Sequence, residues 1–142
     1  MRFLIFLLLF LTNYAIGQDK YPKDYFRSPL DIPLSLAGSF GELRPNHFHS
    51  GIDFRTQQKE GLPVYASADG FISRIRISTT GYGKSIYIDH PNGYTTVYGH
   101  LQRCAPEIQN VLNKEHYAKK SYEIEIRPKA NEMPVKKGDL IA

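Results

Sequence analysis

The sequence predicts a mainly β fold, with antiparallel sheets in a sandwich or barrel-like arrangement. Short runs of β-branched and aromatic residues, glycine-containing turns between them, and polar–apolar alternation within several runs all indicate this class. The 142-residue chain is 42% hydrophobic and 23% charged. This is the composition of a globular protein, and it excludes a disordered or collagen-like chain.

The first 17 residues have the pattern of a secretory signal peptide. Arg2 precedes an apolar run at 3–11, and Ala15-Ile16-Gly17 offers a small-x-small cleavage site before Gln18. The apolar run is too short to span a bilayer, which takes about 20 residues. We therefore expect export to the periplasm, cell envelope or extracellular space, with no transmembrane segment after cleavage. Residues 18–37, rich in proline and aspartate, are expected to form an extended N-terminal arm.

Strand signals follow from residue 38 to residue 100. A bend at 38–41 opens this stretch, and Pro91-Asn92-Gly93 is typical of a hairpin turn. In the run 71–77, alternation puts Phe71, Ser73, Ile75 and Ile77 on one face, opposite the two arginines. Short strands are expected at 51–55, 64–66, 71–77, 85–89 and 94–98.

The pattern changes after Leu101. Pro106 suits a first helical turn and apolar residues follow at helical spacing, which predicts a helix over 106–119. Residues 122–126 alternate cleanly and predict a strand whose two glutamates face away from the core. Residues 134–142 indicate a turn that opens into a strand.

The net charge and the single cysteine exclude few further classes of function. Removing residues 1–17 takes away Arg2 and leaves 17 basic against 14 acidic residues, a net charge of +3. The basic residues are dispersed, so nucleic-acid binding is not indicated. Cys104 is the only cysteine, so it has no partner for an internal disulfide. We expect its side chain to be buried and to behave as a small apolar residue.

One bend in the chain carries groups that can bind a metal. His49 and Asp53 are four residues apart with Gly51 between them, so an imidazole nitrogen and a carboxylate oxygen can converge. Zinc accepts both donors at about 2.0–2.2 Å, but its sites use three or four protein ligands. His47 is an alternative to His49, because the two rings would share a face of a strand. Chemistry alone does not choose between them.

Seven sequence pieces resemble, in the same order, the motifs of the lysostaphin-type zinc metalloendopeptidases, peptidoglycan hydrolases of the duplicated hybrid motif fold. They lie at residues 40–53, 61–70, 81–83, 86–90, 92–93, 96–101 and 135–141. The resemblance covers residues 36–101 and 134–142, and it is interrupted by an insertion at 102–134. A helix and a strand are expected in this insertion, which we expect to form one wall of the substrate groove.

The resemblance implies a secreted, zinc-dependent metalloendopeptidase. His49 and Asp53 match the first two zinc ligands, and His100 matches a catalytic histidine that acts as a general acid/base or stabilises the oxyanion. The implied substrates are peptide cross-links or stem peptides of bacterial peptidoglycan. His90 is expected to be structural, and His116, in the insertion, a solvated helix residue.

Arg44 matches a recurrent position before the ligand loop, where it is expected to be structural. The family completes its zinc site with a His-x-His pair after the strand that begins near Gly138. The resemblance therefore implies that the third ligand lies beyond residue 142. It also implies that residues 38–142 are the N-terminal part of an endopeptidase domain, inactive by themselves.

Two other classes of function stay open. The chain is alternatively a non-catalytic relative that binds or regulates cell-wall hydrolases, or a carrier-like domain of similar architecture. The presence of His49, Asp53 and His100 favours the enzyme, because degenerate relatives usually lose the ligands of the opening motif. The sequence does not indicate an oligomeric state.

Overall fold

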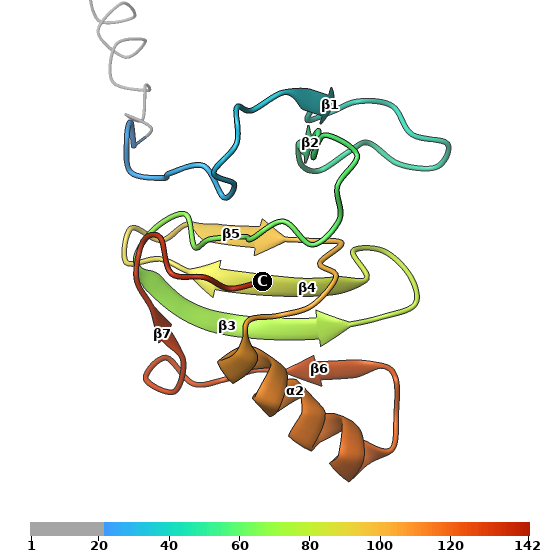
Figure 1. The fold of residues 1–142 in the computed structure, drawn as a ribbon, viewed down its shortest axis with the longest axis vertical. Coiled ribbons are helices and arrows are strands. Elements are labelled where there is room, and N and C mark those ends of the chain that lie inside the picture. Colours follow the sequence, from blue (N-terminus) through green and yellow to red (C-terminus); the bar gives the residue numbers. More distant parts are fainter. Residues whose placement is uncertain (1–21) are drawn as a thin grey trace, which may run out of the picture.

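The computed structural model describes residues 22–142, and the predicted signal peptide lies outside this range (Figure 1). The described chain is mainly β with antiparallel strands, as predicted. Its elements in order are β1 (Leu36–Gly38), β2 (Asp53–Phe54), β3 (Gly70–Ile77), β4 (Lys84–Asp89), β5 (Thr95–Tyr98), α2 (Pro106–Lys119), β6 (Ile124–Ile126) and β7 (Pro134–Val135). None of the helical segments in this range has the length and hydropathy of a membrane span.

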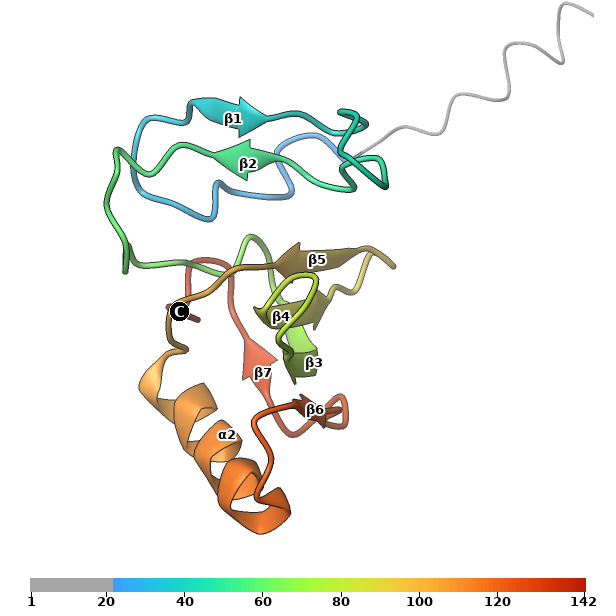
Figure 2. The same cartoon turned by 90° about the vertical axis from the view of Figure 1, so that its right-hand side faces the viewer.

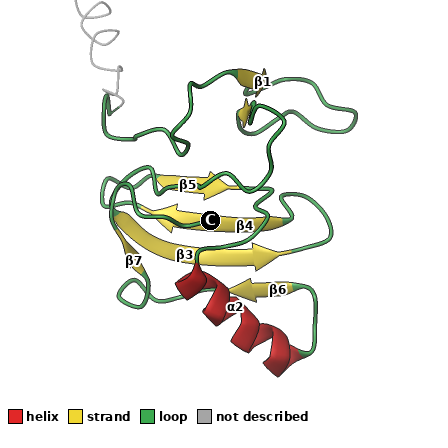
Figure 3. Cartoon of the chain, viewed as in Figure 1, coloured by secondary structure: helices red, strands yellow, loops and turns green. Residues whose placement is uncertain are grey.

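The strands form two separate sheets (Figures 1 and 3). The larger sheet has the order β5-β4-β3-β6, and β7 pairs with the start of β3. The smaller sheet pairs β1 with β2, and it belongs to residues 34–55, which we call the lobe. The lobe stands beyond the β5 edge of the larger sheet, while α2 lies at the opposite end (Figure 2). No closed barrel forms among residues 22–142.

The core of the larger sheet is made mostly of isoleucines. Ile72 and Ile75 on β3 and Ile86 and Ile88 on β4 are all at most 1% exposed, and Leu112 of α2 packs into the same cluster. β-branched side chains suit this environment because they pack densely on a pleated surface.

A β-bulge in β3 makes the alternation of side chains in the run 71–77 differ from the one predicted. Ile72 pairs with Ile88 but Arg74 pairs with Tyr87, so Ser73 is an extra residue on β3. An extra residue reverses the direction of the side chains that follow it. The fully buried residues are therefore Ile72 and Ile75, three apart, and the prediction that Phe71 shares their face is wrong.

Another predicted strand, 64–66, is only a single bridge between Tyr65 and Leu140. The backbone of Ala66 instead bonds to a turn, donating to the Asp139 carbonyl at 2.9 Å and accepting from Gly138 at 2.9 Å. Gly138 has a φ of +95°, a conformation that a strand residue does not adopt. The strand expected after the turn in 134–142 is thereby reduced to the bridge at Leu140, and β7 lies at the start of that segment.

The segment 102–134 joins the larger sheet rather than standing apart from it. α2 has the predicted bounds, and β6 pairs with β3 so that the sheet gains a strand. Glu125 is exposed, as predicted, and accepts from Arg74 of β3 at 2.6 Å. This bond lowers the pKa of Glu125 and raises that of Arg74.

The segment 22–31 is attached to the same sheet. The N–H of Arg27 donates to the Ser67 carbonyl at 2.8 Å, and the Lys137 ammonium donates to the Tyr25 carbonyl at 2.7 Å. The ring of Phe26 packs edge-on against His90, with centroids 5.3 Å apart. These contacts leave the lobe as the part of the described chain that has least contact with the sheet.

Candidate metal and catalytic site

The lobe folds back on itself so that His49 lies close to the end of β1. The N–H of Gly41 donates to the His49 carbonyl at 2.7 Å, and the N–H of His49 donates to the Glu42 carbonyl at 2.8 Å. The N–H of Arg44 then donates to the His47 carbonyl at 2.9 Å, which closes the tip. This hairpin is local, and it positions His49 within reach of Ser39 and Asp53.

His49 and Asp53 are in direct contact. The Nδ1 atom of His49 lies 3.0 Å from the Ser39 carbonyl oxygen, and its Nε2 lies 3.2 Å from Asp53 Oδ1. The Ser39 carbonyl can only accept a hydrogen bond from Nδ1, whereas Arg44 Nη2, 3.5 Å from the same Nδ1, can only donate, so these neighbours do not select one tautomer. With the proton on Nε2 the ring donates to Asp53 Oδ1, and with the proton on Nδ1 the Nε2 lone pair faces that carboxylate oxygen. Two lone pairs at this distance repel each other unless a proton or a metal ion lies between them.

The two donors fit a metal centre. Ligands at about 2.0–2.1 Å around a tetrahedral ion are themselves about 3.3 Å apart, which is close to the 3.2 Å between Nε2 and Oδ1. A ligating histidine also commonly donates its other N–H to a backbone carbonyl, and the 3.0 Å between His49 Nδ1 and the Ser39 carbonyl oxygen suits that arrangement. Within residues 22–142, however, no group of three or more His, Cys, Asp or Glu is gathered closely enough to hold a metal ion.

Arg44 binds the other oxygen of the carboxylate. Its Nη2 lies 2.8 Å from Asp53 Oδ2 and 3.3 Å from Glu42 Oε2, so Asp53 is oriented with Oδ1 toward His49. Gly38 of β1 makes room for this pair, since a Cβ there would lie 2.5 Å from both Arg44 Nη2 and Asp53 Oδ2. Sequence reasoning gave Arg44 no defined partner, because its spacing of nine residues from Asp53 matches no regular periodicity.

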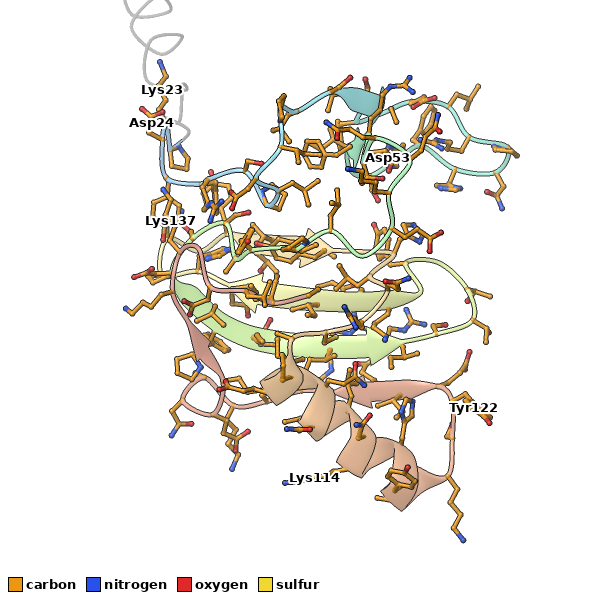
Figure 4. The ribbon with its side chains drawn as sticks, viewed as in Figure 1. Lys23, Asp24, Asp53, Lys114, Tyr122 and Lys137 are labelled. Atoms are coloured by element: carbon orange, nitrogen blue, oxygen red, sulfur yellow. The ribbon has the colours of Figure 1, made fainter. Side chains whose placement is uncertain are left out.

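His100 lies directly after β5, across a cavity from the lobe. Its φ is +56°, and its N–H donates to the Tyr82 carbonyl at 2.9 Å. His100 and Asp53 both line a cavity of about 820 Å³ between the lobe and the sheet. Figure 4 shows Asp53 on the side of the lobe that faces the sheet. The structure therefore brings Asp53 and His100 to one cavity, and His49 joins them through its contact with Asp53.

The remaining walls of the cavity are largely apolar. Leu62, Pro63 and Val97 line it, together with Leu140. From the segment 102–134, only the loop 102–105 and the start of α2 reach it. Most of that segment instead packs at the other end of the sheet, so its contribution to the groove wall is limited to these residues.

The other histidines occupy different environments. His47 is exposed, with Nδ1 2.6 Å from Asn46 Oδ1, so the geometry favours His49 as the partner of Asp53. His90 is buried and bonds the Asp69 carbonyl and Thr96 Oγ1, in agreement with a structural role. The expectation of a solvated His116 is wrong, because its ring is half-buried and Nε2 is shielded from solvent.

Cys104 is a buried residue, as expected. Burial raises the pKa of its thiol to about 11, with a small opposing effect from Lys84. Nucleophilic attack requires the thiolate, which is scarce near neutral pH at that pKa. Although Cys104 lines the cavity, its burial and raised pKa disfavour the role of a catalytic nucleophile.

Comparison with known families identifies the family of the chain. The profile described as Peptidase family M23 matches residues 47–121, which is more than half of the sequence. The chain belongs to peptidase family M23. The resemblance to the lysostaphin-type endopeptidases is thereby confirmed. The matched segment of this M23 chain includes His49, Asp53 and His100.

Several curated relatives match parts of the M23 chain. An "Uncharacterized metalloprotease" of Haemophilus influenzae is 38% identical over 101 residues, covering 65% of this chain and 20% of the relative. The "DD-carboxypeptidase/endopeptidase Mpg" of Neisseria meningitidis is 42% identical over 67 residues, covering 47% and 15%. The "Peptidoglycan DD-endopeptidase ShyC" of Vibrio cholerae is 33% identical over 89 residues, covering 57% and 19%.

The matched region is thus 15–20% of the length of these relatives. No solved structure gives a significant match.

Proposed function

We propose that this M23 chain belongs to a secreted, zinc-dependent metalloendopeptidase that cleaves peptide cross-links or stem peptides of bacterial peptidoglycan. The observation that carries the proposal is the 3.2 Å contact of His49 Nε2 with Asp53 Oδ1, with His49 Nδ1 3.0 Å from the Ser39 carbonyl oxygen. Family membership and relatives named as peptidoglycan-acting enzymes support the substrate. The signal-peptide pattern of residues 1–17 supports export, since peptidoglycan lies outside the cytoplasm.

In this proposal His49 and Asp53 hold the metal ion. When bound, zinc supplies a Lewis acid that polarises a peptide carbonyl and acidifies water. The Ser39 carbonyl orients the His49 ring through Nδ1, and Arg44 restrains the second oxygen of Asp53, so both donors are oriented in advance. The family resemblance implies a third protein donor, and within residues 22–142 no group of three donors is gathered.

His100 is the proposed catalytic residue. An imidazole can accept and return a proton near neutral pH, and as an imidazolium it can stabilise an oxyanion. The bond from its N–H to the Tyr82 carbonyl holds the residue at the cavity that Asp53 also lines. The apolar walls formed by Leu62 and Val97 limit water around a bound peptide.

A pair of histidine variants tests the ligand assignment. In the product of the complete open reading frame, His49→Ala should lower zinc affinity and the rate of dye release from labelled peptidoglycan by at least about 100-fold. His47→Ala removes the same side chain two residues away, and it should change either quantity less than about 2-fold. Equal losses in the two variants, or a fully active His49→Ala protein, would refute the assignment.

The alternative function is a non-catalytic relative that binds or regulates cell-wall hydrolases. The observation that favours it is that only two donors are gathered in the described chain. Such a protein would sediment with purified sacculi and release no soluble fragments, even with added zinc. Release of fragments that stops with a chelator and returns with zinc would instead support the enzyme.

A further inference from the structure

We propose that Tyr82 is a positioning residue that fixes the lobe carrying His49 and Asp53 relative to the sheet carrying His100. The inference rests on the proposed function, because it assigns a role within the same site. Tyr82 lies in the loop between β3 and β4, and no spacing or periodicity in the sequence connects it to the ligand loop.

The side chain of Tyr82 reaches the ligand loop. Its Oη lies 2.6 Å from Ser50 Oγ, across 32 residues of sequence, and Ser50 directly follows His49. Among the hydrogen bonds and ion pairs within residues 22–142, this is the one that links the lobe (residues 34–55) to the rest of the chain. The other polar contacts of the lobe, including those of Arg44, are internal to it.

The same residue also holds His100. The Tyr82 carbonyl accepts the N–H of His100 at 2.9 Å, and the two rings meet edge to face with centroids 6.5 Å apart. Gly99 allows this approach, since a Cβ there would lie 3.3 Å from Tyr82 Cδ1. One residue therefore contacts both halves of the proposed site, through its hydroxyl on one side and its backbone and ring on the other.

Such a link matters because a cavity separates the two halves. The space of about 820 Å³ lies between Asp53 and His100, so direct packing between them does not set their separation. Displacement of a catalytic group by about 1 Å can cost 100-fold in rate. The Tyr82–Ser50 bond restrains the direction in which the lobe would move away from the sheet.

The first test measures the link without any assay of activity. Amide hydrogen exchange of residues 39–55 is compared in the unsubstituted protein, Tyr82→Phe, Ser50→Ala and the double variant. We expect each single variant to speed exchange in the lobe several-fold, the double variant to add nothing further, and β3 and β4 to be unchanged. Tyr94→Phe is the matched control, because Tyr94 is 43% exposed and Tyr82 41%. Unchanged lobe exchange in Tyr82→Phe would overturn the proposal.

The second test uses peptidoglycan hydrolysis by the product of the complete open reading frame. Tyr82→Phe, Ser50→Ala and the double variant should each lower kcat about 10-fold with zinc content retained, and Ser50→Thr, which keeps the hydroxyl, should restore it. Loss in Tyr82→Phe alone would mean that its hydroxyl acts on the substrate, and the positioning role would fall. If the unsubstituted protein hydrolyses nothing, the proposed function fails, while the exchange experiment still decides the link.

Discussion

The lobe and the five-stranded sheet are stabilised by different interactions. In the sheet, Ile75, Ile86 and Ile88 are fully buried, so apolar burial holds it together. In the lobe, Gly38 is the one buried residue, and apart from the half-buried Phe54 its large apolar side chains are 50–75% exposed. Those side chains are Leu34, Leu36, Phe40, Leu43, Phe48 and Ile52. The lobe therefore depends on polar contacts around Arg44 and His49, and the proposed metal ligands belong to the less stable region.

The largest expected effect is on the sheet. Ile86→Ala removes a fully buried side chain and should lower the free energy of unfolding by about 2–5 kcal/mol, because it leaves a cavity in a packed core. Val97→Ala on the neighbouring strand is the control, since Val97 is largely exposed and should cost less than about 1 kcal/mol. Urea denaturation followed by circular dichroism measures both. Similar losses would mean that the sheet lacks the core described above.

The second-largest expected effect is on zinc affinity, and it should be confined to the lobe. Arg44→Ala frees the second oxygen of Asp53, and zinc affinity should fall about 10–100-fold while the midpoint of thermal unfolding hardly changes. Arg55→Ala removes an arginine side chain of the same lobe that donates to the Leu36 carbonyl and not to Asp53, so its zinc affinity should be retained. Zinc titration and thermal unfolding provide the two readouts. A large drop in melting temperature in Arg44→Ala would show that the two regions are not separable.

A smaller effect concerns alkaline pH. The folded-state pKa of the Cys104 thiol, about 11, lies above its ordinary value of 9.0 because burial disfavours the thiolate. The resulting stability is fully present below pH 9 and is lost as pH rises from 9 toward 11. Cys104→Ala should therefore show a shallower fall in melting temperature over that range than the unsubstituted protein.

Alkylation provides an independent check on the same thiol. Iodoacetamide at pH 8 should modify Cys104 slowly in the folded protein and rapidly in urea, because the thiolate is the reacting species. Rapid modification of the folded protein would mean that solvent reaches the part of the core that borders the cavity.

Local patterns account for what could be predicted. The antiparallel β class, the helix at 106–119, the outward glutamates and the hairpin at 91–93 follow from periodicity and turn chemistry over a few residues. Ordered motifs were enough to indicate the family, which the comparison confirmed. The metal-ligand roles of His49 and Asp53 and the catalytic role of His100 stay predictions, although the structure brings Asp53 and His100 to one cavity.

By itself, then, the sequence determined the fold class and the family, and it predicted His49 and Asp53 as a donor pair, because each is expressed over short distances along the chain. Tertiary structure decided the bulge at Ser73, the pairing of Arg44 with Asp53 and the contact of Tyr82 with Ser50. These features depend on strand register and on loops from different sheets meeting in space. Neither is encoded in any local periodicity, so the link between the two halves of the site became visible only in the folded chain.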